Sequence, residues 1–122
     1  MMLLLWIAAV VSAATFFVHV VAGGKFVAAP LLESDALPQA AKWLLYYCWH
    51  ITSILIAFMA FAFGWLAMTG ADDDAVIFFA SLATSLSLLS AVVALKGGIF
   101  PLRFPSTSLF AAISLFGWAA LL

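Results

Sequence analysis

Charged side chains are scarce in this chain of 122 residues: they make up 7% of it, four of them basic and five acidic. An ordinary soluble domain carries about a quarter charged residues. With a net charge of −1 there is no basic surface for nucleic acid, so we expect no nucleic-acid partner. The single cysteine, Cys48, excludes an internal disulfide and a dithiol redox pair.

The residue combinations that usually carry catalysis are also missing. No Asp or Glu interrupts the long apolar stretches, which disfavours proton-coupled transport through a membrane-embedded carboxylate. The sequence has no glycine-rich phosphate loop with a basic residue, no hydrolase triad pattern and no set of metal ligands. We therefore predict no catalytic residue and no metal site, and we favour a protein that is not an enzyme.

Hydrophobic residues, in contrast, make up 69% of the chain and form four uncharged stretches. Each stretch is close to the ~20 residues that a helix needs to cross the hydrocarbon core, and only helices satisfy their own backbone groups in lipid. We predict an all-α integral membrane protein of one domain, residues 1–122, with four transmembrane helices in an up-down bundle. The expected helices are about 2–23, 37–69, 74–96 and 106–121.

The first stretch has one alternative interpretation, a cleaved signal peptide. It lacks a basic leading region and is longer than the apolar core of a signal peptide, so we expect a retained helix. All four Lys and Arg residues fall in the first and third connections, whereas the second, Ala71 to Asp74, holds three Asp. The positive-inside rule then places both termini on the non-cytoplasmic side.

The first connection is unusual because the segment from Phe26 to Leu32 is apolar. Gly23, Gly24 and Pro30 are expected to break its helix, so we predict an apolar loop along the membrane interface. A Gly-Gly pair followed by an aromatic residue and a proline recurs in the third connection, from Gly97 to Pro101. This echo fits two duplicated helical hairpins, although the same residues are ordinary loop material.

Small and polar residues recur every three or four positions within the apolar stretches. Transmembrane helices associate through such residues, which allow close approach and interhelical hydrogen bonds. We therefore expect them to form helix-packing faces, and hydroxyl groups on these faces to link helices rather than to act as nucleophiles. The predicted packing residues are Ser12, Thr15, Ser53, Ala57, Ala60, Gly64, Thr84 and Ser87.

The two histidines, His19 and His50, lie on these small-residue faces at similar expected depths, on helices joined by one connection. Ionisable groups within a membrane are costly and often functional, and imidazole binds metal, haem iron or protons. One hypothesis is a cofactor site in which His19 and His50 hold a haem b, or in which they contact a quinone. The alternative is that both rings only form hydrogen bonds that fix the helix pair.

The expected function follows from how little of the chain lies outside the apolar stretches. We expect a multi-pass protein of a bacterial inner membrane, in contact with the lipid bilayer, that is an accessory subunit of a larger membrane complex or a homo-oligomer. The alternative is ligand binding or electron transfer at His19 and His50. A channel is less favoured, because no stretch carries a polar stripe that would line a hydrated path.

Overall fold

A computed structural model describes residues 1–70 and 72–122; Ala71, at the start of the predicted second connection, lies outside the described residues. Helix accounts for 87% of the chain and no strand is found in the described part, which confirms the all-helical prediction. The elements are α1 (Met2–Phe17), the π-helical segment η1 (Val18–Ala28), α2 (Ala29–Glu33), α3 (Gln39–Thr69), α4 (Asp73–Lys96), the short 3-10 helix η2 (Pro101–Arg103) and α5 (Pro105–Ala119).

The first three elements form one continuous helix, Met2–Glu33, and this corrects two predictions. The helix does not end near residue 23, and the apolar segment after Gly24 is helical rather than an interfacial loop. Pro30 does not interrupt it, because the wider hydrogen-bond pattern of η1 ends just before, with the Ala29 N–H bonded to the Gly24 carbonyl. Proline has no N–H, so it occupies the start of α2 without leaving a donor unpaired.

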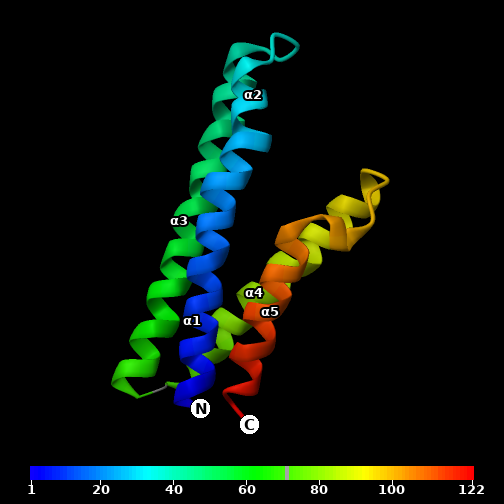
Figure 1. Cartoon of the computed structure of the whole chain (residues 1–122). Coiled ribbons are helices and arrows are strands. Elements are labelled where there is room, and N and C mark those ends of the chain that lie inside the picture. The colour runs from blue at the N-terminus through cyan, green and yellow to red at the C-terminus, as the bar shows by residue number, and fades with distance from the viewer. Residues whose placement is uncertain (71) are drawn as a thin grey trace.

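The helices form two hairpins that diverge from a common base (Figure 1). The long hairpin pairs Met2–Glu33 with α3 through a short turn at residues 34–38. Across this turn, the Lys42 ammonium at the start of α3 donates to the Leu32 carbonyl at 3.1 Å. The short hairpin pairs α4 with α5, and α5 also packs on α1. Both chain termini lie at the base, while the turns after α2 and α4 lie at the two far tips.

Among the described residues, three helices are long and apolar enough to cross a membrane: Met2–Glu33, Gln39–Thr69 and Asp73–Lys96. At 1.5 Å per residue, the 31 residues of α3 span about 46 Å, well beyond a hydrocarbon core of about 30 Å. Helix α5 has 15 residues and spans only about 22 Å. The long hairpin therefore exceeds one membrane thickness, whereas α5 falls short of it.

Local chemistry explains the helix ends at the connection between α3 and α4 and at the turn after α4. Gly70 ends α3 with a φ of 94°, which glycine adopts readily. The Asp72 carboxylate accepts from the Asp74 N–H at 3.1 Å and caps α4. After α4, Gly98 turns the chain with a φ of 70°.

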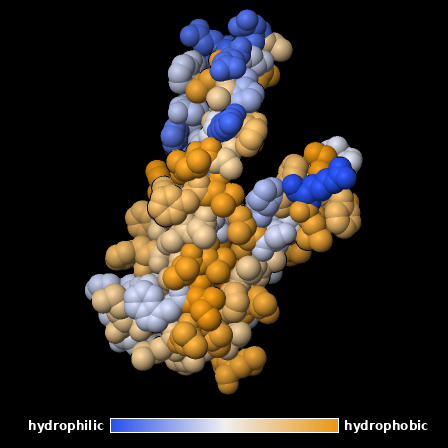
Figure 2. Space-filling model, in the orientation of Figure 1, coloured by the Kyte–Doolittle hydropathy of each residue, from blue (hydrophilic) through white to orange (hydrophobic). Residues whose placement is uncertain are grey.

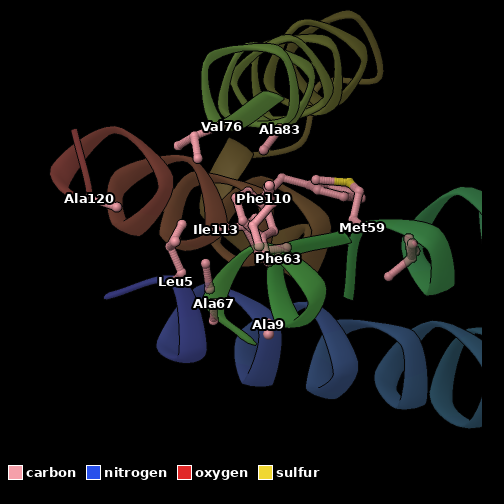
Figure 3. Packing of buried hydrophobic residues seen from close by; sticks show 13 residues of the cluster. Leu5, Ala9, Met59, Phe63, Ala67, Val76, Ala83, Phe110, Ile113 and Ala120 are labelled. Carbon is pink, nitrogen blue, oxygen red and sulfur yellow. The ribbon is translucent and has the colours of Figure 1, made fainter. Parts of the chain in front are cut away.

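The apolar core lies at the base, where α1, α3, α4 and α5 meet (Figure 3). Phe63 of α3 is fully buried there, together with Leu5, Val76 and Ile113 from the other three helices. Gly117 of α5 is buried at the same place: a Cβ on it would lie 3.0 Å from the Ala80 Cβ and 3.3 Å from the Phe63 Cζ. The absent side chain thus sets how closely α5 approaches α3 and α4.

Candidate functional site

A groove of about 330 Å³ lies at the point where the two hairpins diverge. One wall comes from α1 and η1, another from α3, and the third from the start of α5. Figure 2 shows the division of the molecule into two arms above an apolar base, with hydrophilic residues gathered at the arm tips. The groove is lined by Thr15, Val18, His19, Ala22, Gly23, Phe26, Val27, Trp49, Ile56, Phe104, Pro105, Ser106, Leu109 and Phe110.

His19 is the only histidine, cysteine or acidic residue among those that line this groove in the described chain. Its Nε2 lies 3.3 Å from the backbone oxygen of Trp49, and a carbonyl oxygen only accepts hydrogen bonds. The Nε2 atom therefore donates in this contact. The imidazole also stacks on the Trp49 indole, with ring centroids 3.8 Å apart and an interplanar angle of 18°. Both contacts fix the orientation of the ring.

Gly23 makes this arrangement sterically feasible. A Cβ at this position would clash with the Trp49 ring, whose Cζ2 atom would lie only 3.1 Å away. At Gly24, in contrast, no atom lies within 4 Å of the site that a Cβ would occupy. The first glycine of the pair is therefore a packing residue for Trp49, and the second has no such constraint.

His50 takes a different position from His19. It is exposed, packs edge-on against Tyr46 with centroids 4.5 Å apart at 81°, and is absent from the residues that line the groove in the described chain. His19 contacts Trp49, the residue before His50. The structure thus brings the two histidines to neighbouring positions but gives only His19 to the groove, and shared cofactor ligation by the pair stays a prediction.

The π-helical geometry of η1 coincides with the groove. Val18, His19, Ala22, Gly23, Phe26 and Val27 all belong to this segment. A π-helical segment is rare in proteins and is frequently found at functional sites. Its wider turns change the direction of successive side chains relative to an α-helix, so that one face presents His19 and Gly23 to Trp49.

A second groove, of about 320 Å³, lies on the α4–α5 hairpin. It is lined by Thr84, Ser87, Leu88, Ala111, Ser114, Leu115 and Trp118. The Thr84 hydroxyl donates to the Ala80 carbonyl at 2.8 Å and lies 2.6 Å from the Ser114 hydroxyl. Since Thr84 has one hydrogen, Ser114 is the donor to it, and the Trp118 indole N–H donates to Thr84 as well, at 3.1 Å.

The hydroxyl contacts continue along the α4–α5 seam toward the tip. Ser87 donates to the Thr107 carbonyl at 2.9 Å. Ser90 lies 2.6 Å from the Ser106 hydroxyl and 2.8 Å from the Thr107 hydroxyl. Each of these contacts joins the two helices, so the short hairpin is held together by a row of interhelical hydrogen bonds.

The predicted packing residues divide into three groups. Ser12, Thr15 and Ser53 are buried, and each donates to a carbonyl four residues earlier in its own helix. Thr84 and Ser87 lie between α4 and α5, as described above. Ala60 and Gly64 are half-buried, with Gly64 facing Ala9 of α1, whereas Ala57 is exposed.

Removal of the Thr84 hydroxyl tests the α4–α5 hydrogen bonds. Thr84→Val keeps the side-chain shape but leaves Ser114 and Trp118 without their acceptor, so we expect a loss of about 1 kcal/mol in the free energy of unfolding. Ser85→Ala is the matched control, because the exposed Ser85 hydroxyl donates to the Ser81 carbonyl of its own helix. Thermal unfolding in detergent, followed by circular dichroism, gives the comparison. Equal midpoints for both variants would show that the row adds no stability.

The described residues contain no group of three or more His, Cys, Asp or Glu side chains that could hold a metal ion. Comparison with protein-family models, with curated proteins and with solved structures found no match for this chain. Sequence reasoning selected His19 but missed Trp49 and the α5 wall of the groove. The only sequence signal for the Trp49 contact was Gly23 itself, a small residue that allows an aromatic ring from another helix to lie close.

Proposed function

We propose that this chain is a small polytopic membrane subunit that works by lateral association, either in a larger complex of a bacterial inner membrane or as a homo-oligomer. Three apolar helices of sufficient length support the membrane placement. Helix α5 packs along α4 and α1. In this proposal α5, together with the apolar residues that flank it, is the fourth membrane crossing and lies at the same depth as the helices on which it packs. Apart from the tip of the long hairpin, little of the chain remains outside the bilayer to carry another role.

Charge supports an orientation with both termini on the non-cytoplasmic side. Lys25 lies in the second half of Met2–Glu33 and Lys42 in the first half of α3, toward the turn that joins them, and Lys96 and Arg103 flank the turn between α4 and α5. The Asp72 to Asp74 triplet lies at the opposite end, with the termini. In this placement Lys25 and Lys42 mark the cytoplasmic interface, and the helical tip beyond them projects into the cytoplasm.

The observation that carries the association proposal is the hydroxyl-lined groove on the α4–α5 hairpin. Transmembrane helices pack through small residues and hydroxyl groups, whereas lipid-facing surfaces are apolar. Ala111 is exposed in this groove and provides room for a close helix approach. Ser114, which donates to Thr84, keeps free acceptor capacity for a group from a partner.

A bulky substitution at Ala111 tests this surface without altering a hydrogen bond of the α4–α5 seam. Ala111→Phe fills the groove, and we expect it to shift the protein from a larger species to the mass of a single chain after extraction in mild detergent. Native electrophoresis and chemical cross-linking in membranes measure the shift. Ala14→Phe, at an exposed alanine of α1 outside both grooves, is the matched control and should leave assembly unchanged.

The outcomes of this experiment separate the two forms of the proposal. A cross-linked product at twice the chain mass that is lost in Ala111→Phe indicates a homo-oligomer, and a heavier mixed product indicates a larger complex. A wild-type protein that is a single chain in native membranes, with no cross-linked partner, would contradict lateral association.

A further inference from the structure

The groove beside His19 has the composition of a small-molecule site. Such sites are mostly apolar, with a few convergent polar groups, and have volumes of about 300–1,000 Å³. Here the lining is aliphatic and aromatic except for Thr15, His19, the Trp49 indole and Ser106. Residues from both hairpins form it, so an occupant would contact the long and the short arm together.

The hydrogen bonds already formed decide what the polar side chains can still offer. Thr15 donates to the Val11 carbonyl at 2.7 Å, and the His19 Nε2 donates to the Trp49 carbonyl at 3.3 Å. A charged imidazolium is costly inside a membrane, so the neutral ring with Nε2 protonated leaves Nδ1 as an acceptor. Both side chains therefore have acceptor capacity for a ligand that brings its own O–H or N–H donor.

The size and shape of the groove narrow the class of ligand further. A cavity of about 150 Å³ holds a benzene molecule, so a groove of about 330 Å³ has room for one substituted six-membered ring. The four-pyrrole macrocycle of haem is several times larger than one such ring. Phe26, Trp49, Phe104 and Phe110 provide aromatic surfaces on several sides, and such surfaces pack favourably against a flat ring.

We infer that this groove binds the ring of a membrane-soluble quinol, with the His19 imidazole accepting a hydrogen bond from a quinol hydroxyl. The apolar tail of the quinol leaves between the hairpins toward lipid. Gly23 and Trp49 position the imidazole for this contact. The inference shares with the proposed function its membrane placement, but it is independent of lateral association.

Depth along the helix agrees with such a ligand. His19 lies six residues before Lys25 in the same π-helical segment, between one and two turns from the predicted cytoplasmic interface. A quinol entering laterally from the lipid can therefore reach the imidazole without crossing the polar tip of the long hairpin. Access from the bilayer, rather than from water, is what an apolar groove between diverging hairpins provides.

Binding of a benzoquinol with a decyl tail to the full chain in lipid nanodiscs tests the inference. Titration is followed by quenching of tryptophan emission, with partition into empty nanodiscs subtracted. We expect saturable binding of one quinol per chain, and at least tenfold weaker binding by His19→Leu. The decyl benzoquinone, which has no hydroxyl donor, should also bind at least tenfold more weakly. His50→Leu is the matched control and should bind as the wild type does.

Two further variants keep the result interpretable. Val18→Phe fills the groove from η1 without changing His19, and it should abolish saturable binding while the helical circular dichroism stays unchanged. Ala111→Phe should bind quinol normally even where it prevents association, which separates failure of this inference from failure of the proposed function. Equal affinity of wild type and His19→Leu, equal affinity for quinol and quinone, or a haem absorption band that depends on His19 would each overturn the inference.

Discussion

Replacement of Gly23 by leucine is expected to destabilise the long hairpin by about 1–3 kcal/mol relative to Gly24→Leu, the range typical of overpacking. The cause is steric: a Cβ at Gly23 clashes with the Trp49 ring, so the indole must leave its place between the two helices. In the wild type the centroids of the His19 and Trp49 rings are 3.8 Å apart. The variant loses this stacking, and the groove loses the wall that Trp49 provides. Thermal unfolding in detergent measures the stability difference.

Gly24→Leu is a closely matched control for this change. Both substitutions place the same residue in the same helical segment, so the gain in helix propensity, about 1 kcal/mol, cancels in the comparison. The Gly24 position is open, so its variant should be as stable as the wild type or more so. Near-ultraviolet circular dichroism adds a readout of tryptophan packing, which should change in Gly23→Leu alone. Identical spectra and midpoints for the two variants would show that Trp49 does not pack on Gly23.

Replacement of Gly117 by leucine should have the other large effect, because it acts where α3, α4 and α5 converge. Even a Cβ would lie 3.0 Å from the Ala80 Cβ and 3.5 Å from its Cα, atoms that can move only with the whole α4 helix. We therefore expect α5 to be displaced from the base and the free energy of unfolding to fall by about 3 kcal/mol, the upper end of overpacking costs.

A graded series separates sterics from helix propensity at this position. Gly117→Ala should be destabilising or neutral, whereas Gly64→Ala should be neutral or stabilising by up to about 1 kcal/mol. At Gly64 the nearest atoms to a Cβ, on Ala9 and Trp6, lie at 3.9 Å, which is ordinary contact. Proteolysis of the α5 segment during thermal unfolding reports its detachment directly. A Gly117→Leu variant as stable as Gly64→Ala would contradict the close approach of α5.

The all-helical fold was predictable from the sequence, because helices are the usual way for long apolar stretches with few charges to satisfy their backbone hydrogen bonds in lipid. The two Gly-Gly pairs show where such reasoning fails. Gly97 and Gly98 end a helix, with Gly98 at a φ of 70°, but Gly23 and Gly24 continue one. Trp49, a residue distant in sequence, packs on Gly23, and local propensity contains no record of that contact.

The packing faces were predictable only in part, for a related reason. Residue spacing identifies hydroxyl groups such as Thr84 and Ser87, which indeed lie between α4 and α5. It also selects Ala57, which is exposed, because the buried face of α3 is formed instead by large residues that include Ile56, Met59 and Phe63. When nearly every residue is apolar, the spacing of small and polar residues alone does not show which side of a helix faces the neighbouring helices.

The candidate site combines a residue that the sequence identified with others that it did not. His19 stood out as one of the two histidines in the apolar stretches. Its separation from the exposed His50 depends on the rotation of the helices about their axes, which is set by the Trp49 contact and by the geometry of η1. The α5 wall, including Phe104 and Phe110, depends on how the hairpins diverge, and no sequence pattern predicts that angle.

Cysteine labelling in oriented membranes tests the central claim, four crossings with both termini outside, most directly. The single native cysteine makes the design simple: Cys48→Ser provides the background, and one cysteine replaces Asp35, Asp73 or Ile99 in turn. A membrane-impermeant maleimide should label Asp35→Cys and Ile99→Cys only from the cytoplasmic face, and Asp73→Cys only from the opposite face. Labelling of Asp73→Cys and Ile99→Cys from the same face would contradict the account, because α4 would then not cross the membrane.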